Sequence, residues 1–148
     1  MLRVTVTQSW PLTGLDANLV RLSKTAFQAQ MKEVLKSAKR HATSGRPGLI
    51  RRTGALERGI KLGPLELGGQ MRQSLLTTVI YGRIHELGGT ITAKKGPYMT
   101  FPINGRWVRV RSVTIPARPY LAPAMEEGLR NWPQIADGVA AAFVARKS

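Results

Sequence analysis

The stretch IPARPYLAPAM, residues 115–125, contains three prolines within eleven residues. A residue that precedes proline is driven into extended backbone, and proline itself has a fixed φ. We therefore expect a stiff connection that leaves a β-strand and delivers a helix at a set angle, because Pro119 can lie just before that helix or in its first turn. Tyr120 and Leu121 are then expected to anchor the helix on a sheet.

The chain after this connection has a helical pattern. Leu121, Met125 and Leu129 recur every four residues, which predicts one helix face. We expect Met125 and Leu129 to be buried against the sheet, so that Leu129→Asp would bury a carboxylate without a partner and cost several kcal/mol. Pro133 interrupts the pattern and predicts the start of a second helix. The apolar row of this second helix is formed by Ile135, Val139, Ala142 and Phe143.

Upstream, the patterns predict a strand and then a long helix. Alternation over LRVTVTQ, residues 2–8, is typical of a strand. Thr13 and Asp16 have the spacing of a capping box, and the helical pattern runs from Leu15 to about Arg40. Two neighbouring apolar rows lie on this helix: Leu15, Leu19, Leu22 and Ala26, and beside them Val20, Phe27, Met31, Val34 and Ala38.

The middle of the chain predicts a hairpin and a short helix. Thr53 is expected to cap one short helical turn. Strands at about 58–67 and 70–80 are then joined by a Gly68-Gly69 turn. The segment YGRIHELGG, residues 81–89, has helical spacing and stops at two glycines, which is a helix C-cap signal.

A second hairpin joins YMTFPI to RWVRVRSV through Asn104-Gly105, a strong type I′ turn signal. Pro102 lacks the N–H of a ladder donor, so its strand is predicted to be an edge. The whole chain, residues 1–148, is thus predicted to be one α+β domain. It has a long N-terminal helix, an antiparallel sheet of hairpins, and a C-terminal helix or helix pair packed on the sheet.

The composition narrows the function. The chain has 23 Lys and Arg against 8 Asp and Glu, a formal net charge of +15. This charge indicates a polyanion or a strongly acidic protein surface as partner. The absence of cysteine excludes disulfides, iron–sulfur clusters and thiolate zinc sites. No apolar run approaches the roughly 18 residues of a membrane span, so we expect no membrane partner.

Two basic clusters are candidates to contact DNA or an acidic protein, and charge alone does not choose between these partners. One is Arg46, Arg51 and Arg52 in the loop predicted for residues 39–52; the other is Lys94, Lys95, Arg106, Arg109 and Arg111 in the second hairpin. Arg109 and Arg111 are predicted to share one strand face, opposite Val108 and Val110. Trp107 could stack on bases, as in single-strand binders, but we expect it to pack in or under the hairpin.

The sequence gives little support for a catalytic function. The acids are scattered: Asp16, Glu33, Glu57, Glu66, Glu86, Glu126, Glu127 and Asp137. The segment HELGG lacks the second histidine of a zincin helix, and no phosphate-binding glycine loop is present. We therefore predict a protein that is not an enzyme and has no cofactor and no metal site. His85 and Glu86 are expected to be architectural, with Glu86 facing an arginine such as Arg118.

Arg118 itself allows two interpretations. On a stiff backbone its guanidinium suits a bidentate contact to a carboxylate or phosphate of a neighbour. The alternative is an internal ion pair with a local carboxylate such as Glu86.

Three motifs in order resemble a known family: TGAL at 53–56, VIYGRIHELGG at 79–89 and IPARPYLAPAM at 115–125. They are similar to segments of the phage tail-component proteins of the gene product ten-like type and of the tail-completion proteins of Mu-like phages. Tyr120 stands where phenylalanine is commoner in the family. Each motif alone is weak, but their order and spacing agree, and the resemblance covers roughly residues 15 to 145.

The resemblance implies a structural virion protein that forms a homo-oligomeric ring, often sixfold, at the head–tail junction or tail of a long-tailed double-stranded DNA phage. Such a ring assembles in the host cytoplasm, contacts other neck and tail proteins, and surrounds DNA without sequence preference. The residues expected to serve subunit packing are His85, Glu86, Arg118, Tyr120, Leu121 and Met125. The alternative is a monomeric module that binds nucleic acid independently of sequence.

Overall fold

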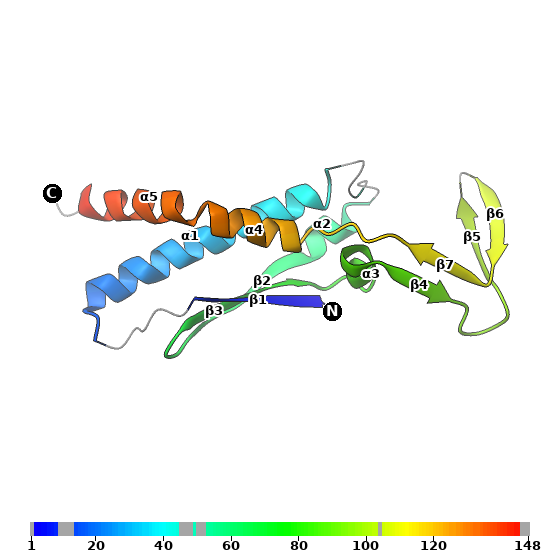
Figure 1. Ribbon diagram of the computed structural model, residues 1–148, viewed down its shortest axis with the longest axis horizontal. Helices are drawn as coiled ribbons and strands as arrows, with labels where there is room; N and C mark the ends of the chain where they lie inside the picture. The colour runs from blue at the N-terminus through cyan, green and yellow to red at the C-terminus, as the bar shows by residue number, and fades with distance from the viewer. Residues whose placement is uncertain (1, 9–13, 45–48, 50–52, 104, 146–148) are drawn as a thin grey trace.

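The computed structural model of the chain describes residues 2–8, 14–44, 49, 53–103 and 105–145. It confirms the predicted α+β architecture (Figure 1). In chain order the elements are β1 (Leu2–Gln8), α1 (Ala17–His41), α2 (Ala55–Gly59), β2 (Ile60–Leu67), β3 (Met71–Thr77), α3 (Gly82–Leu87), β4 (Gly89–Thr92), β5 (Met99–Ile103), β6 (Arg106–Val110), β7 (Ser112–Ile115), α4 (Ala122–Arg130) and α5 (Trp132–Ala145).

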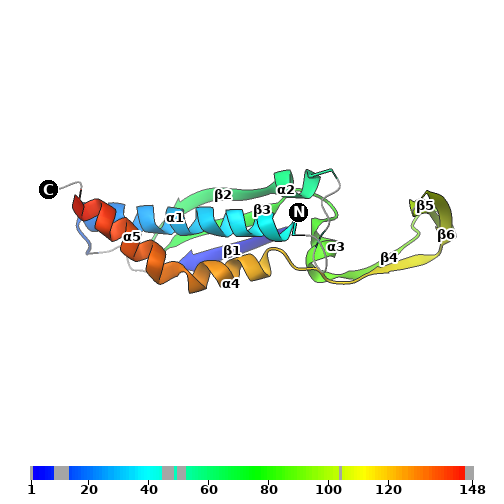
Figure 2. The same ribbon diagram turned by 90° about the horizontal axis from the view of Figure 1, so that it is seen from above.

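The body of the molecule has two layers, a three-stranded sheet and a layer of helices (Figures 1 and 2). The strand order is β1-β3-β2, and the pairings within this sheet are antiparallel. The hairpin predicted around Gly68-Gly69 is therefore confirmed as β2 with β3, and the N-terminal strand β1 pairs with the other edge of β3. The register of β2 against β3 shifts between Leu62 and Leu65. Gly63 and Pro64 lie at this shift, where a proline can be accommodated without a ladder N–H.

The long helix α1 begins at Ala17, two residues after the Leu15 start that its sequence predicts. Asp16 is the N-cap, and its Oδ1 accepts hydrogen bonds from the backbone N–H groups of Asn18 at 2.6 Å and Leu19 at 3.0 Å. Thr13, the other half of the expected capping box, lies outside the described residues. The row that continues to Ala38 is buried, whereas the Leu15 and Leu19 side chains are exposed, because the first turns of α1 lie beside α5 and not over the core.

The core lies where α1, the sheet and the start of α4 meet. One cluster joins Val34 and Ala38 of α1 to Ile60 and Leu75 of the sheet. Three residues of the proline-rich segment complete it: Tyr120, Leu121 and Ala124. A second cluster contains Phe27, Met31 and Met71, with Met125 packed against it. The predicted anchoring of the helix by Tyr120 and Leu121 is therefore confirmed, and Met125, predicted to be buried, is half-buried.

Leu129 is a correction, because its side chain is 60% exposed. Residues four apart on an α-helix are offset by about 40°, so Leu129 has rotated by about 80° from Leu121. The face of α4 that meets α1 instead carries Ala124 and Gly128, both buried. A Cβ added at Gly128 would collide with the Val34 side chain, so the absence of a side chain at Gly128 is what permits this close approach.

The C-terminal region forms the predicted pair of helices. The chain leaves α4 at Asn131, whose backbone N–H donates to the Glu127 carbonyl, and Pro133 lies in the first turn of α5. Helix α5 runs beside the first part of α1 (Figures 1 and 2) and has no fully buried residue. No described helix is both long and apolar enough to cross a membrane.

Glycines mark one end of each of the short helices α2 and α3. The N-cap of α2 is Gly54, with φ of 69°, and not Thr53 as predicted, although the Thr53 hydroxyl still accepts a 3.3 Å hydrogen bond from the Ala55 N–H. Helix α3 ends as predicted at Gly88, whose φ is 68°. A left-handed backbone at these two positions favours glycine.

The second hairpin differs from the expectation in its extent. RWVRVRSV does not form one strand, since β6 ends at Val110 and β7 turns back to pair with β4, a strand that was not predicted. We call residues 89–115 the arm and its end, β5 with β6, the tip hairpin. The arm projects away from the two-layer body (Figures 1 and 2). Pro102 lies on an edge strand, as predicted, because among the described residues β5 pairs with β6 alone.

Candidate functional site

Glu86 fixes the base of the arm. Its carboxylate is 7% exposed. Oε2 accepts hydrogen bonds from the backbone N–H groups of Tyr120 at 2.8 Å and Leu121 at 2.9 Å, and Oε1 accepts from Ala122 at 2.9 Å. The first N–H groups of a helix have no partner inside the helix and favour an anion. A side chain distant in sequence thus caps α4, a role that no pattern in the sequence indicates.

The expected ion pair between Glu86 and Arg118 is therefore wrong, since it is not among the ion pairs of the described residues. Arg118 contributes its backbone, donating from its N–H to the His85 carbonyl at 2.7 Å. Its side chain is exposed, as a contact to a neighbour requires. Burial, and then the nearby Arg118 charge, lower the pKa of His85, which favours the neutral imidazole.

Two glycines let α3 approach the proline-rich segment. A Cβ at Gly82 would lie 2.7 Å from Thr77 Cγ2 and 2.8 Å from the Tyr120 hydroxyl, and one at Gly88 would lie 2.7 Å from the Ala117 nitrogen. The Tyr120 hydroxyl donates to the Gly82 carbonyl at 3.2 Å. Burial raises the pKa of Tyr120 to about 12, so its phenol stays neutral and acts as an anchor.

The three motifs that carry the family resemblance meet in space. They line one cavity of about 530 Å³, together with the end of α1. Its lining includes Gly54 and Leu56 of the first motif, Tyr81 and His85 of the second, and Arg118 of the third. The rings of Tyr81 and His85 contact edge to face with their centroids 5.7 Å apart.

The tip hairpin has two unlike faces. Register places Met99 opposite Val110, Phe101 opposite Val108, and Ile103 opposite Arg106. Directly paired residues share a face, so one face is apolar except for Arg106 at its end. The other face carries Thr100, Pro102, Trp107 and Arg109, all exposed. The predicted separation of Val108 and Val110 from Arg109 is confirmed, whereas Arg111 lies beyond the end of β6.

Arginines gather on this second face. The guanidinium carbons of Arg109 and Arg111 lie 4.2 Å and 5.5 Å from the centroid of the Tyr98 ring. Lys94 and Lys95 are also exposed, and so is Arg106, which lies on the apolar face of the tip hairpin. No acid occurs in the sequence between Glu86 and Glu126. The charge of the arm therefore favours anions, and two of its guanidinium groups make cation–π contacts with one ring.

Trp107 is a further correction. Its side chain is 74% exposed and does not pack under the hairpin, because the paired residue on its face is Pro102, and a two-stranded sheet leaves both faces open. Arg46, Arg51 and Arg52, the other predicted basic cluster, lie outside the described residues. Of the two clusters, the structure thus describes the one on the arm.

One polar cluster was not foreseen. Glu127 of α4 accepts hydrogen bonds from Ser37 and from Arg40, at 2.5 Å for the latter, and lies 2.9 Å from His41 Nε2. The hydrogen bond from Ser37 is the main cause that lowers the pKa of Glu127. Ser37 and His41 both contact the carboxylate and not each other, so the cluster joins α1 to α4 without the base–nucleophile contact of a triad.

No group of three or more metal-ligating residues forms within the described part of the chain. Comparisons of the chain with protein-family models, curated proteins and solved structures find no match.

Proposed function

We propose that this protein is a structural subunit of a homo-oligomeric ring at the head–tail junction of a long-tailed double-stranded DNA phage, in the neck or as a tail-completion or terminator layer. The three ordered motifs support the proposal, and so does their convergence on one cavity beside the base of the arm. In this role the protein assembles with copies of itself and with other neck and tail proteins, and the ring surrounds the DNA path.

The arm is the observation that carries this proposal. A two-stranded ribbon alone is at best marginally stable in water. The two core clusters of the described residues contain no residue of the arm, yet the tip hairpin presents an apolar face. A projecting ribbon of this kind is suited to a role in which a neighbouring subunit covers that face.

The basic face suits the DNA path. Arg109, Arg111 and Tyr98 present charge without an acid nearby. Diffuse attraction to phosphate carries no sequence information and is compatible with sliding of the duplex. An acidic neighbouring ring would meet the same surface by the same electrostatics, and this remains the competing partner for the basic face.

The test is the mass and shape of the purified protein. We expect native mass spectrometry and sedimentation to give a discrete multiple of the 16.2 kDa subunit, with sixfold rings in electron micrographs. A protein that remains monomeric up to high concentration and still binds DNA would favour the alternative, a monomeric sequence-independent nucleic-acid-binding module. The exposed Trp107 and the arginine face are the features that support this alternative.

A further inference from the structure

The tip hairpin and the region where α5 lies beside the start of α1 are at opposite ends of the elongated molecule (Figures 1 and 2). Each carries an apolar surface. One is the apolar face of the tip hairpin. The other is a groove between the first turns of α1 and the end of α5, which we call the α1–α5 groove. Surfaces that differ and lie at opposite ends permit head-to-tail contacts between copies, which generate a ring when the rotation closes.

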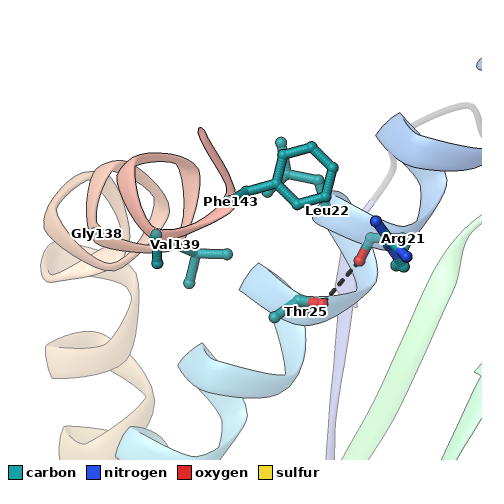
Figure 3. A pocket seen from close by; sticks show the side chains of 7 residues that line it. Arg21, Leu22, Thr25, Gly138, Val139 and Phe143 are labelled. Carbon is teal, nitrogen blue, oxygen red and sulfur yellow. Dashed lines mark hydrogen bonds between the residues drawn. The ribbon is translucent and has the colours of Figure 1, made fainter. Parts of the chain in front are cut away.

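The α1–α5 groove is open and apolar. Its volume is about 460 Å³, and Leu22 of α1 faces Val139, Ala142 and Phe143 of α5 across it. Figure 3 shows the Phe143 ring above α1 with Arg21 at the margin, where its guanidinium carbon lies 5.3 Å from the ring centroid. The Thr25 hydroxyl is not free, because it donates to the Arg21 carbonyl at 2.8 Å.

Helix α5 lacks the character of a solvent-facing helix. It has no fully buried residue, although its sequence WPQIADGVAAAFVA contains a single charged side chain, Asp137. Val144 is 65% exposed near its end. A helix that is apolar around most of its circumference is normally buried. In the single chain, the side of α5 that lines the groove is therefore incompletely covered by other residues.

The tip hairpin has the complementary properties. Its apolar face is a narrow ridge of Met99, Phe101 and Val108 that ends at Ile103, which is 47% exposed. Arg106, opposite Ile103, brings a cation to the same face. All charged residues of the arm are cations, and the single charged residue of α5 is Asp137, next to the groove residue Gly138. Arg21 lies at the α1 margin of the groove, so an apolar contact pairs opposite charges when Arg106 lies on the α5 side, near Asp137.

We propose that the apolar face of the tip hairpin of one copy docks in the α1–α5 groove of the next copy, with Arg106 near Asp137 of that neighbour. The contact is heterologous and leaves the Arg109 and Arg111 face uncovered. The inference rests on the proposed ring function and specifies which surfaces build the ring.

The absence of native cysteine allows a direct test. Ile103→Cys and Ala142→Cys are purified separately, reduced, mixed and oxidised. We expect a disulfide between the two variants and little within either alone, because a disulfide requires Cα atoms within roughly 7 Å. Thr100→Cys, on the opposite face of the hairpin, is the matched control and should not couple to Ala142→Cys. Equal coupling of both hairpin variants would overturn the inference.

A second measurement separates this inference from the proposed function. Ala142→Arg places a charge in the groove, and Ala141→Arg places the same charge on an exposed neighbouring position of α5. We expect only Ala142→Arg to raise the concentration for half-assembly, by about tenfold or more for 1.4 kcal/mol of lost contact. Normal assembly of a folded Ala142→Arg protein would overturn the docking and leave the ring intact, whereas a monomeric wild type would refute the ring itself.

Discussion

Replacing Glu86 by alanine tests whether one carboxylate holds the arm to the body. The side chain is nearly buried, and its two oxygens accept hydrogen bonds from the backbone N–H groups of three successive residues at the start of α4. In Glu86→Ala these donors lose their acceptor. The hydrogen bonds from the N–H groups of Tyr120 and Leu121 are buried, whereas the hydrogen bond from the Ala122 N–H is partly buried.

The expected loss follows from these burial differences. An unsatisfied buried donor costs about 1–3 kcal/mol. Two buried donors and one that water can reach therefore predict a loss of about 3–5 kcal/mol in the free energy of unfolding. That is a large part of the 5–15 kcal/mol typical of a folded domain. It corresponds to a fall of roughly 6–20 °C in Tm for a chain of this length.

Urea unfolding followed by circular dichroism measures this loss. Glu126→Ala is the matched control, because it removes an exposed carboxylate from α4 itself and should change the free energy of unfolding by about 0.5 kcal/mol or less. Glu86→Gln should fall between the two, since the amide keeps one acceptor oxygen. If Glu86→Ala were as stable as Glu126→Ala, the carboxylate would not be what fixes α4 to α3.

Three further outcomes are expected. Leu129→Asp should change the free energy of unfolding by no more than about 0.5 kcal/mol in the same urea assay, because the side chain is exposed; a loss of several kcal/mol would restore the buried position. Glu127→Gln should be less stable than wild type by about 0.5–1 kcal/mol at neutral pH. Because the bond from Ser37 lowers the folded pKa of Glu127, this difference should vanish in unfolding curves as pH falls through that pKa. Arg109→Glu with Arg111→Glu should abolish weak duplex DNA binding, and each single Arg→Ala change should lower the slope of log affinity against log salt by about one per lost phosphate contact; unchanged binding would assign the basic face to protein.

Local signals account for what the sequence predicted well. The turn at Gly68-Gly69 and the end of α3 at Gly88 each depend on a few neighbouring residues. Caps and turns are decided by side-chain hydrogen bonding and by φ, both of which act within a few residues of chain. The α+β class followed because these signals separate long helical periodicity from alternating strands.

Non-local pairing accounts for what the sequence missed. Strand β4 is only four residues long, and its partner β7 lies beyond the whole tip hairpin. The pair is held in part by a 3.1 Å hydrogen bond between the hydroxyls of Thr90 and Thr114. Glu86 likewise finds its partners 34 to 36 positions away. Neither periodicity nor capping rules report contacts at such separations.

Leu129 and Trp107 show a different limit. Periodicity identifies an apolar face but not the surface that covers it, and in a subunit of an assembly that surface can belong to another chain. Small residues caused the opposite error, in which a buried face was not predicted. Ala124 and Gly128 do not form an apolar row of large side chains, although they form the contact of α4 with α1. In this helix close approach, and not side-chain size, selects the buried face.

The positions of the motifs distinguish the residues that attach the arm to the body from the residues that form the surfaces of the arm. The second and third motifs flank the arm at its two ends, and the Glu86 bonds and the Arg118-to-His85 bond join them directly. Both ends of the arm are thus held to the body by these hydrogen bonds, whereas the tip hairpin is a separate two-stranded sheet beyond β4 and β7. The motifs therefore specify the geometry of the base. In the ring that we propose, the residues between them supply one apolar and one basic face for partners, and neither face belongs to the core clusters of the described residues.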